Sequence, residues 1–354
     1  MTNETTQAKK TFNTRELYNK IIRKRIYFII CSLMILLSFF TIDIMTGASL
    51  LSIKEVLYTI FFSSSSDYQT YVIVWIMRMP VAVMAVIVGA SLSVAGAEMQ
   101  TILDNPMATP YTLGISSAAS FGAYLAIVIG KGIIPVREDL IIPINAFVFS
   151  LALSLLIYFI ARVKKGTSET IILAGISFSF LFSSLASILN YIATEESRQK
   201  IIMWSYGSLS ASKWSTVIIV FIVFIVTVPL LLVDSWKITS LKLGDSKAKS
   251  LGVNVERIRL KVLVIVSLIA ATSVCFVGTI GFIGLAGPHI ARSFVGEDHR
   301  YFIPCSALIG ACILSISSVL SKVLVPGAII DVGLITAIIG MPFLLSIVLR
   351  RKNY

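Results

Sequence analysis

The stretch "GFIGLAGPHIAR", residues 281–292, interrupts a chain that is otherwise rich in long apolar runs. Within twelve residues it has three glycines, a proline, a histidine and an arginine. As a helix it would be only about 18 Å long, at about 1.5 Å per residue. Whether this stretch crosses a membrane decides the number of crossings, and with it the side on which the C-terminus lies.

The composition around it is that of a polytopic membrane protein. Of 354 residues, 56% are hydrophobic and only 14% are charged, against roughly 45–50% apolar residues in soluble domains. A membrane-spanning helix needs about 20 mostly apolar residues. By that measure, we expect an all-α protein with spans near residues 26–45, 80–101, 113–130, 142–161, 169–193, 215–234, 260–280, 302–321 and 332–349.

The distribution of Lys and Arg indicates that residues 281–292 form a tenth crossing. With ten crossings both termini share one side, which then holds 21 Lys and Arg against eight on the other. The positive-inside rule places that side in the cytoplasm. We therefore predict a basic cytoplasmic segment at residues 1–25, retained because it lacks a signal-peptide pattern, and a single transmembrane domain at 26–354.

The short crossing suits a site within protein, since broken segments at membrane depth occur only where they are buried or line a cavity. We expect Gly281 and Gly284 to loosen its entry, Pro288 to set its bend, and Arg292 to reach the cytoplasmic head groups. His289 is interpreted as a hydrogen-bonded packing residue in preference to an iron ligand.

Several function classes lack the residues they need. The net charge of +12 is explained by lipid head groups and topology, so no nucleic-acid partner is expected. The sequence has no H-E-x-x-H, G-x-S-x-G or Walker A pattern, and its cysteines, Cys31, Cys275, Cys305 and Cys312, show no CxxC spacing and are interpreted as buried small hydrophobes. We predict no enzyme activity, no metal site and no cofactor on this chain.

Polar residues within and between the spans suggest where function lies. Ser183 and Ser187 belong to a serine-rich fifth span and either hydrogen-bond to other helices or line a wet pathway. The loop "LDNPMATP", residues 103–110, has no basic residue and is expected to pack into protein. Residues 241–260 suggest two short helices, the first capped by Asp245 and ended by Gly252, the second beginning near Val253. This pair is either an interfacial anchor or a docking surface.

Seven motifs, in order, give the chain a family resemblance. They are "WIMRMP" (75–80), "GAEMQTILDNPMATPYTLGISSAASFGA" (96–123), "LAGIS" (173–177), "MWSYGSLS" (203–210), "LGDSKAKSLGV" (243–253), "GFIGLAGPHIAR" (281–292) and "TAIIGMPFLLSIVLRR" (336–351). With them, residues 73–351 resemble the FecCD/cobalamin-type permease subunit of ABC importers for iron–siderophore complexes, haem or cobalamin.

The resemblance implies a type II ABC importer permease fold of about ten helices in a bacterial or archaeal cell membrane. It also implies a second permease subunit, identical or different, an extracytoplasmic binding protein, and two ATPase subunits that carry the ATP and Mg²⁺. Import of an iron–siderophore complex is the expected function, with a haem or cobalamin chelate next. The alternative is an ion-coupled secondary transporter, although few charges lie within the spans.

The resemblance also implies roles for individual residues. Within the cytoplasmic loop 235–259, ATPase coupling would involve Leu243, Gly244, Asp245, Ala248, Leu251 and Gly252. Arg78 and Lys322 would dock the binding protein on the outer face. Asn105, Met107, Ser168 and Glu169 would form the inner gate, although a helix cap at Ser168, with Glu169 beside it, is an equally sufficient explanation of that pair.

Overall fold

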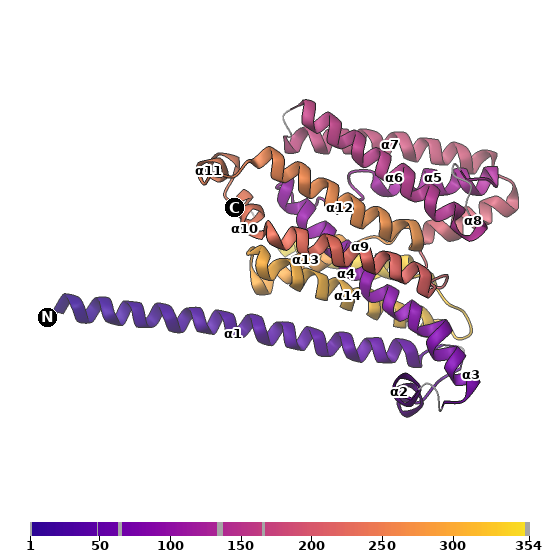
Figure 1. The fold of residues 1–354 in the computed structure, drawn as a ribbon, viewed down its shortest axis with the longest axis horizontal. Coiled ribbons are helices and arrows are strands. Elements are labelled where there is room, and N and C mark those ends of the chain that lie inside the picture. The colour runs from indigo at the N-terminus through magenta and orange to yellow at the C-terminus, as the bar shows by residue number, and fades with distance from the viewer. Residues whose placement is uncertain (1, 48, 63–65, 133–136, 165–166, 351–354) are drawn as a thin grey trace.

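The computed structural model describes residues 2–47, 49–62, 66–132, 137–164 and 167–350. All regular secondary structure in these ranges is helical (Figure 1). The helices are α1 (Thr2–Met45), α2 (Ile53–Phe61), α3 (Tyr68–Tyr71), the π-helix η2 (Val72–Arg78), α4 (Met79–Ile102), α5 (Ile115–Ile129), α6 (Glu138–Val163), α7 (Ser168–Ile192), α8 (Glu195–Tyr206), α9 (Trp214–Val233), α10 (Ser235–Leu241), α11 (Asp245–Ser250), α12 (Val255–Val277), α13 (Ile283–Val295), α14 (His299–Val323) and α15 (Val332–Arg350). The expected all-α class is confirmed.

Each of the nine predicted spans coincides with a helix. Seven helical segments among the described residues are long and apolar enough to cross a membrane: 22–45, 68–102, 138–163, 168–192, 214–233, 255–277 and 299–323. Helix α5 and the first part of α15 are apolar but shorter. Residues 281–292 fall largely in α13, a helix of 13 residues. A total of ten crossings therefore stays a prediction.

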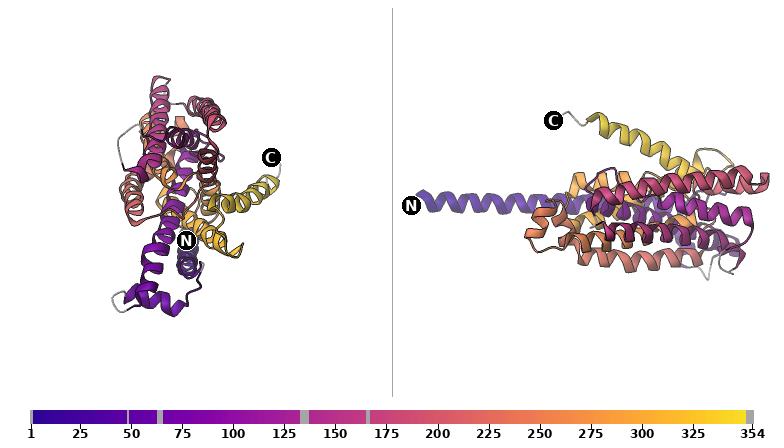
Figure 2. Two further views of the ribbon diagram at one scale, coloured as in Figure 1. Left: turned by 90° about the vertical axis from the view of Figure 1, so that its right-hand side faces the viewer. Right: turned by 90° about the horizontal axis from the view of Figure 1, so that it is seen from above.

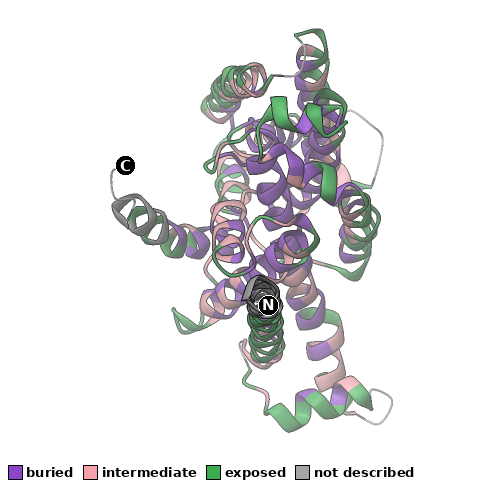
Figure 3. Ribbon diagram, turned by 90° about the vertical axis from the view of Figure 1, so that its left-hand side faces the viewer, coloured by how far each residue is buried: buried purple, intermediate pink, exposed green. Residues whose placement is uncertain are grey.

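Helices α4, α12 and α14 form the centre of the bundle, and α7 and α9 lie at its edge. In α12, 78% of the most apolar window is buried, whereas the corresponding share in α7 is 17%. Figure 3 shows this contrast, with buried residues concentrated in the middle of the bundle. In Figure 2, the N-terminal part of α1 extends beyond the bundle and α15 diverges from it.

Small residues bring the central helices into close contact. A Cβ atom at Gly96 of α4 would overlap the carbonyl of Gly284 in α13, and one at Gly89 would overlap the carbonyl of Gly310 in α14. Without a hydrophobic driving force between helices in lipid, association depends on such close backbone packing. The short helix α13 is thus held against the centre of the bundle.

The region predicted to hold two short helices differs from the expectation in detail. The paired short helices are α10 and α11, and after Gly252 (φ +81°) the chain enters the long helix α12. The predicted second short helix is wrong because Asn254 caps an apolar run that continues through the bundle. Asp245 is also not the cap, since Gly244 (φ +91°) occupies the N-cap position and frees the Asp245 carboxylate.

Candidate functional site

A polar cavity of about 530 Å³ lies at the end of the bundle where α4 ends and α7, α11 and α12 begin. Its lining is Thr101, Leu103, Asp104, Asn105, Pro106, Ser168, Glu169, Ile172, Leu241, Gly244, Asp245 and Arg259. Three of the predicted gate residues, Asn105, Ser168 and Glu169, therefore meet two of the predicted coupling residues, Gly244 and Asp245, around one space. We call this space the gate cavity.

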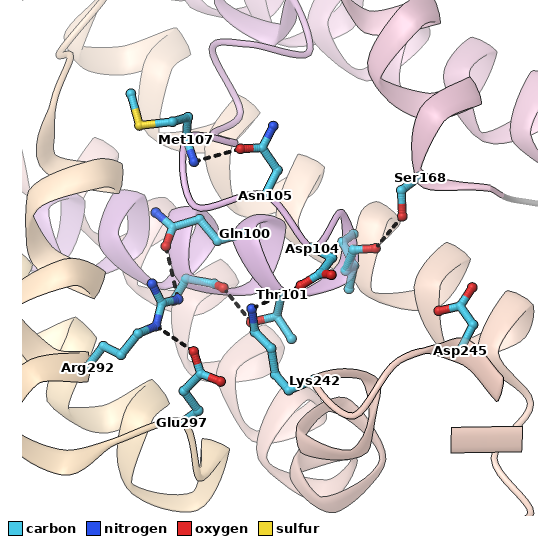
Figure 4. A network of polar contacts seen from close by, with 12 residues as sticks. Gln100, Thr101, Asp104, Asn105, Met107, Ser168, Lys242, Asp245, Arg292 and Glu297 are labelled. Atoms are coloured by element: carbon cyan, nitrogen blue, oxygen red, sulfur yellow. Dashed lines mark hydrogen bonds and ion pairs between the residues drawn. The ribbon is translucent and has the colours of Figure 1, made fainter. Parts of the chain in front are cut away.

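The loop after α4 supplies one wall of the gate cavity. Asp104 adopts a left-handed conformation (φ +46°), and the Asn105 side chain accepts a hydrogen bond of 2.9 Å from the Met107 amide (Figure 4). Such side-chain to backbone bonds fix tight turns. Leu103 and Ala108 are buried, whereas Asp104 and Met107 are exposed, so the expectation that this loop packs into protein holds for its ends but not for its middle. Met107 is left half-exposed beside the cavity.

Arg259, near the start of α12, connects the other walls. Its Nε donates to the Ile102 carbonyl at 2.7 Å, and its two terminal nitrogens bind the Asp245 carboxylate at 3.0 and 3.4 Å. Ile102 is the last residue of α4, where backbone carbonyls have no partner within the helix and a cation is favoured. The buried Arg259 thus links α11 directly to the end of α4.

Ser168, at the start of α7, binds the same Ile102 carbonyl. Its hydroxyl donates to the Ile102 oxygen at 3.4 Å. The interpretation of Ser168 as a helix cap is wrong, because Thr167 is the N-cap and its hydroxyl accepts from the Thr170 amide. Glu169 is exposed in the first turn of α7, where a carboxylate favours the helix dipole.

A second connection joins α10 and α11 to the loop. Lys242, between those two helices, lies 3.6 Å from the Asp104 carboxylate, which is largely exposed. Because this carboxylate is open to solvent, the pair contributes little on its own, about 0.2–1 kcal/mol. Together with Arg259, it gives the α10–α11 segment two separate contacts with the end of α4. These contacts tie the α10–α11 segment to the loop after α4, residues 103–110, which we call the gate loop.

Arg292 does not reach outward as predicted. Its guanidinium binds the carboxylate of Glu297 and the Gln100 side chain, both at 3.1 Å (Figure 4). It also lies over the Phe302 ring. Gln100 in turn donates to the Gly284 carbonyl at 3.2 Å. The charge is thus satisfied within the protein, and it ties α13 to α4.

A buried histidine missed by sequence reasoning lies beside these contacts. His299 at the start of α14 is fully buried, with its ring 3.1 Å from the Thr101 hydroxyl, 3.2 Å from Thr239 of α10, and 3.5 Å from the equally buried Glu98. Within the described ranges, no group of three His, Cys, Asp or Glu residues could hold a metal ion. Of the cysteines, Cys31 is exposed on α1, so the expectation that all four are buried is wrong.

The predicted pathway serines line a different cavity, of about 490 Å³, between α5, α7 and α8. Ser183 donates to the Ser117 hydroxyl at 3.1 Å, and Ser187 donates to the Ser183 carbonyl at 2.9 Å. Ser183 thus bonds to the neighbouring helix α5, whereas Ser187 bonds within α7, and both serines line the cavity. A wet pathway along them stays a prediction. The lining of this serine cavity is rich in hydroxyl groups and has no charged side chain.

The two predicted docking cations are buried and already paired. Lys322 lies 2.9 Å from the carboxylate of Asp43 in α1. Arg78 donates to the carbonyls of Ile44 and Met45, both at 2.9 Å, and to Ser49. The expected exposure of both charges is wrong because they close the corner between α1, η2 and α14. Neither charge is free in this structure to pair with another protein.

A family model and several known permeases match this chain. A model of the FecCD transport family matches residues 33–350. The hemin transport system permease of Yersinia pestis is 35% identical, over 83% of this chain and 88% of that protein. An Fe(3+)-citrate import permease of Bacillus subtilis is 34% identical (93% and 96%), and a molybdate import permease of Haemophilus influenzae is 32% identical (79% and 82%).

A solved structure shares the fold. It is described as an inward-facing conformation of a metal-chelate type ABC transporter. The match has a TM-score of 0.80 at 28% identity and covers 91% of this chain and 98% of that one. The helix arrangement described above is thus that of an ABC transporter permease.

Proposed function

The chain belongs to the FecCD transport family, and we propose that it carries an iron–siderophore complex or a related chelate across the cytoplasmic membrane as the permease subunit of an ABC importer. The relatives are named for the import of hemin, Fe(3+)-citrate or molybdate, so both chelates and an oxyanion are candidate substrates. The hydroxyl-lined serine cavity supports a large hydrogen-bonding chelate over a bare oxyanion, because an oxyanion would favour cationic partners.

The proposed assembly pairs the chain with a second permease subunit, identical or different, two ATPase subunits and an extracytoplasmic binding protein. ATP and Mg²⁺ would be held by the ATPase subunits, with both termini of this chain in the cytoplasm. The poorly buried helix α7 supports a second permease subunit, because its exposed face mixes serines with apolar residues such as Phe180 and so suits protein more than lipid alone.

The observation that carries the proposal is the chain of contacts from the α10–α11 segment to the gate loop, through Asp245, Arg259 and Ile102. The outer surface of this segment supports its role as the ATPase contact. Leu243 and Leu251 are both about half-exposed there. A Cβ atom at Gly244 or Gly252 would meet nothing within 4 Å, so the surface has room for a partner.

The test is a coupling measurement on the reconstituted importer. Leu251→Glu is expected to abolish substrate-stimulated ATP hydrolysis, because a charge would replace an apolar side chain at the proposed contact. Melting of the purified permease should be unchanged, since Leu251 is exposed. Lys164→Glu, at the exposed end of α6, is the matched control and should retain stimulation. Normal stimulation of Leu251→Glu would reject the coupling surface.

A further inference from the structure

A second cavity, of about 560 Å³, lies where α9, α10 and α12 meet. Its lining is Asp234, Trp236, Lys237, Gly252, Val253, Asn254, Arg257, Ile258 and Lys261. Three cationic side chains thus face this space with a single carboxylate. We call it the joint pocket.

The carboxylate fixes two of the cations in place. Asp234 is buried between α9 and α10, where it accepts from Lys237 at 2.7 Å and from Lys261 of α12. Burial alone would raise the pKa of Asp234, but the hydrogen bonds and charges of the two lysines lower it overall. Asp234 is therefore ionised at neutral pH and holds both ammonium groups at the wall of the pocket, with each lysine side chain still about half-exposed.

Arg257 adds a further positive charge to the joint pocket. It lies in the first turn of α12, is exposed, and forms no ion pair with any residue in the described part of the chain. Arginine offers two parallel donors that match a phosphate. The joint pocket therefore keeps an excess of positive charge after its internal pairs are counted.

An apolar face leads directly to the pocket. Along α9, the most hydrophobic of the candidate spans, the exposed side chains recur at helical spacing, at Ile218, Ile222, Ile225, Val226, Leu230 and Val233. The exposed Trp236 follows one turn later, at the edge of the pocket. Trp is enriched at the boundary between hydrocarbon and head groups. The joint pocket thus lies at head-group depth, directly after a face suited to acyl chains.

We propose that the joint pocket binds the head group of an anionic phospholipid, with its acyl chains along the exposed face of α9. The phosphate would contact Arg257 and the two lysines, and Trp236 would cover the glycerol region. A neutral lipid has no net charge to match the excess of cations. An acidic segment of a partner protein would match the charge but would leave the adjoining apolar face uncovered, so the lipid fits both features.

The experiment is lipid titration of the purified full-length protein, followed by native mass spectrometry. Phosphatidylglycerol is compared with phosphatidylcholine of the same acyl chains. The wild type is expected to prefer phosphatidylglycerol, and Arg257→Gln is expected to weaken that binding about fivefold, the effect of one cation near an anionic membrane surface. Because Arg257 is exposed and outside any ion pair, this variant should fold normally.

Two control variants and one soluble competitor sharpen the test. Arg257→Lys should keep most of the preference, and Arg162→Gln, which removes an exposed cation at the end of α6, should keep all of it. Soluble glycerol 3-phosphate should not displace the lipid at equal concentration. Equal binding of the two lipids, an unchanged preference in Arg257→Gln, or displacement by glycerol 3-phosphate would each overturn the assignment.

Discussion

Replacement of Arg259 by methionine would disconnect the α10–α11 segment from the gate loop while keeping a side chain of similar length. The wild-type guanidinium is buried and supplies the 2.7 Å bond to the Ile102 carbonyl together with two contacts to Asp245. After the change, the Ile102 carbonyl keeps only the 3.4 Å bond from Ser168. The variant thus leaves a buried acceptor poorly satisfied and Asp245 unpaired.

The expected loss of stability follows from these two contacts. A buried carbonyl without a good partner costs about 1–3 kcal/mol. An ion pair to the half-exposed Asp245 contributes about 0.2–1 kcal/mol. We therefore expect Arg259→Met to lower stability by about 1–4 kcal/mol. The stability of Arg259→Lys should lie between that of the wild type and that of Arg259→Met, because an ammonium group cannot bind a carbonyl and both carboxylate oxygens with the geometry of a guanidinium.

The informative assay separates coupling from folding. At a temperature at which the Arg259→Met importer is fully folded, substrate stimulation of ATP hydrolysis should fall about fivefold or more, the range typical of lost coupling between sites. Basal hydrolysis should change little, since the ATPase subunits are unaltered. Arg162→Gln serves as a control that removes an exposed arginine at the same end of the bundle. Full stimulation in Arg259→Met would refute the proposed connection.

Three further predictions concern packing and charge. Gly96→Val should lower the melting temperature strongly, because its Cβ would overlap a carbonyl of α13. Gly281→Ala should leave the melting temperature unchanged, because a Cβ at that position has free space. Equal melting temperatures of the two variants would contradict the packing account. Lys322→Met should destabilise the protein by about 3–5 kcal/mol by leaving the buried Asp43 unpaired. Adding Asp43→Asn should recover part of this loss. A double mutant no more stable than Lys322→Met would count against the pair. Asp234 has a lowered pKa, so its stabilising effect is complete above the ordinary Asp pKa of about 3.9 and is lost as the pH falls through the folded-state pKa. The difference in melting temperature between wild type and Asp234→Asn should therefore persist from pH 7 to about pH 4 and shrink below it, and growth of that difference on acidification would contradict the assignment.

The membrane-spanning helices could be predicted because span length and hydrophobicity are local properties of the sequence. The short helices α2 and α8 fell outside the predicted spans for the same reason, since each lacks a long apolar run. Their start signals were present nonetheless. Ser52 and Glu55 form a capping box at α2, and Thr194 caps α8.

The site was predictable only in its parts. The family resemblance predicted gate roles for Asn105 and Ser168 and a coupling role for Asp245, but it did not predict which residue joins them. Arg259 binds a backbone carbonyl 157 positions away, and a carbonyl carries no residue-specific signal.

The prediction that Lys322 is exposed was wrong for a similar reason. Its partner, Asp43, is 279 positions distant, so the sequence shows the charge but not the partner that removes it from the surface.

The most direct test of the account is uptake of a ⁵⁵Fe-labelled ferric siderophore into vesicles that contain the permease. With the ATPase subunits and the binding protein present, we expect uptake that requires ATP and falls sharply in Arg259→Met. With the permease alone, an imposed proton or sodium gradient should give none. Gradient-driven uptake by the permease alone, at a rate that ATP and the partner subunits do not change, would contradict the account and establish a secondary transporter instead.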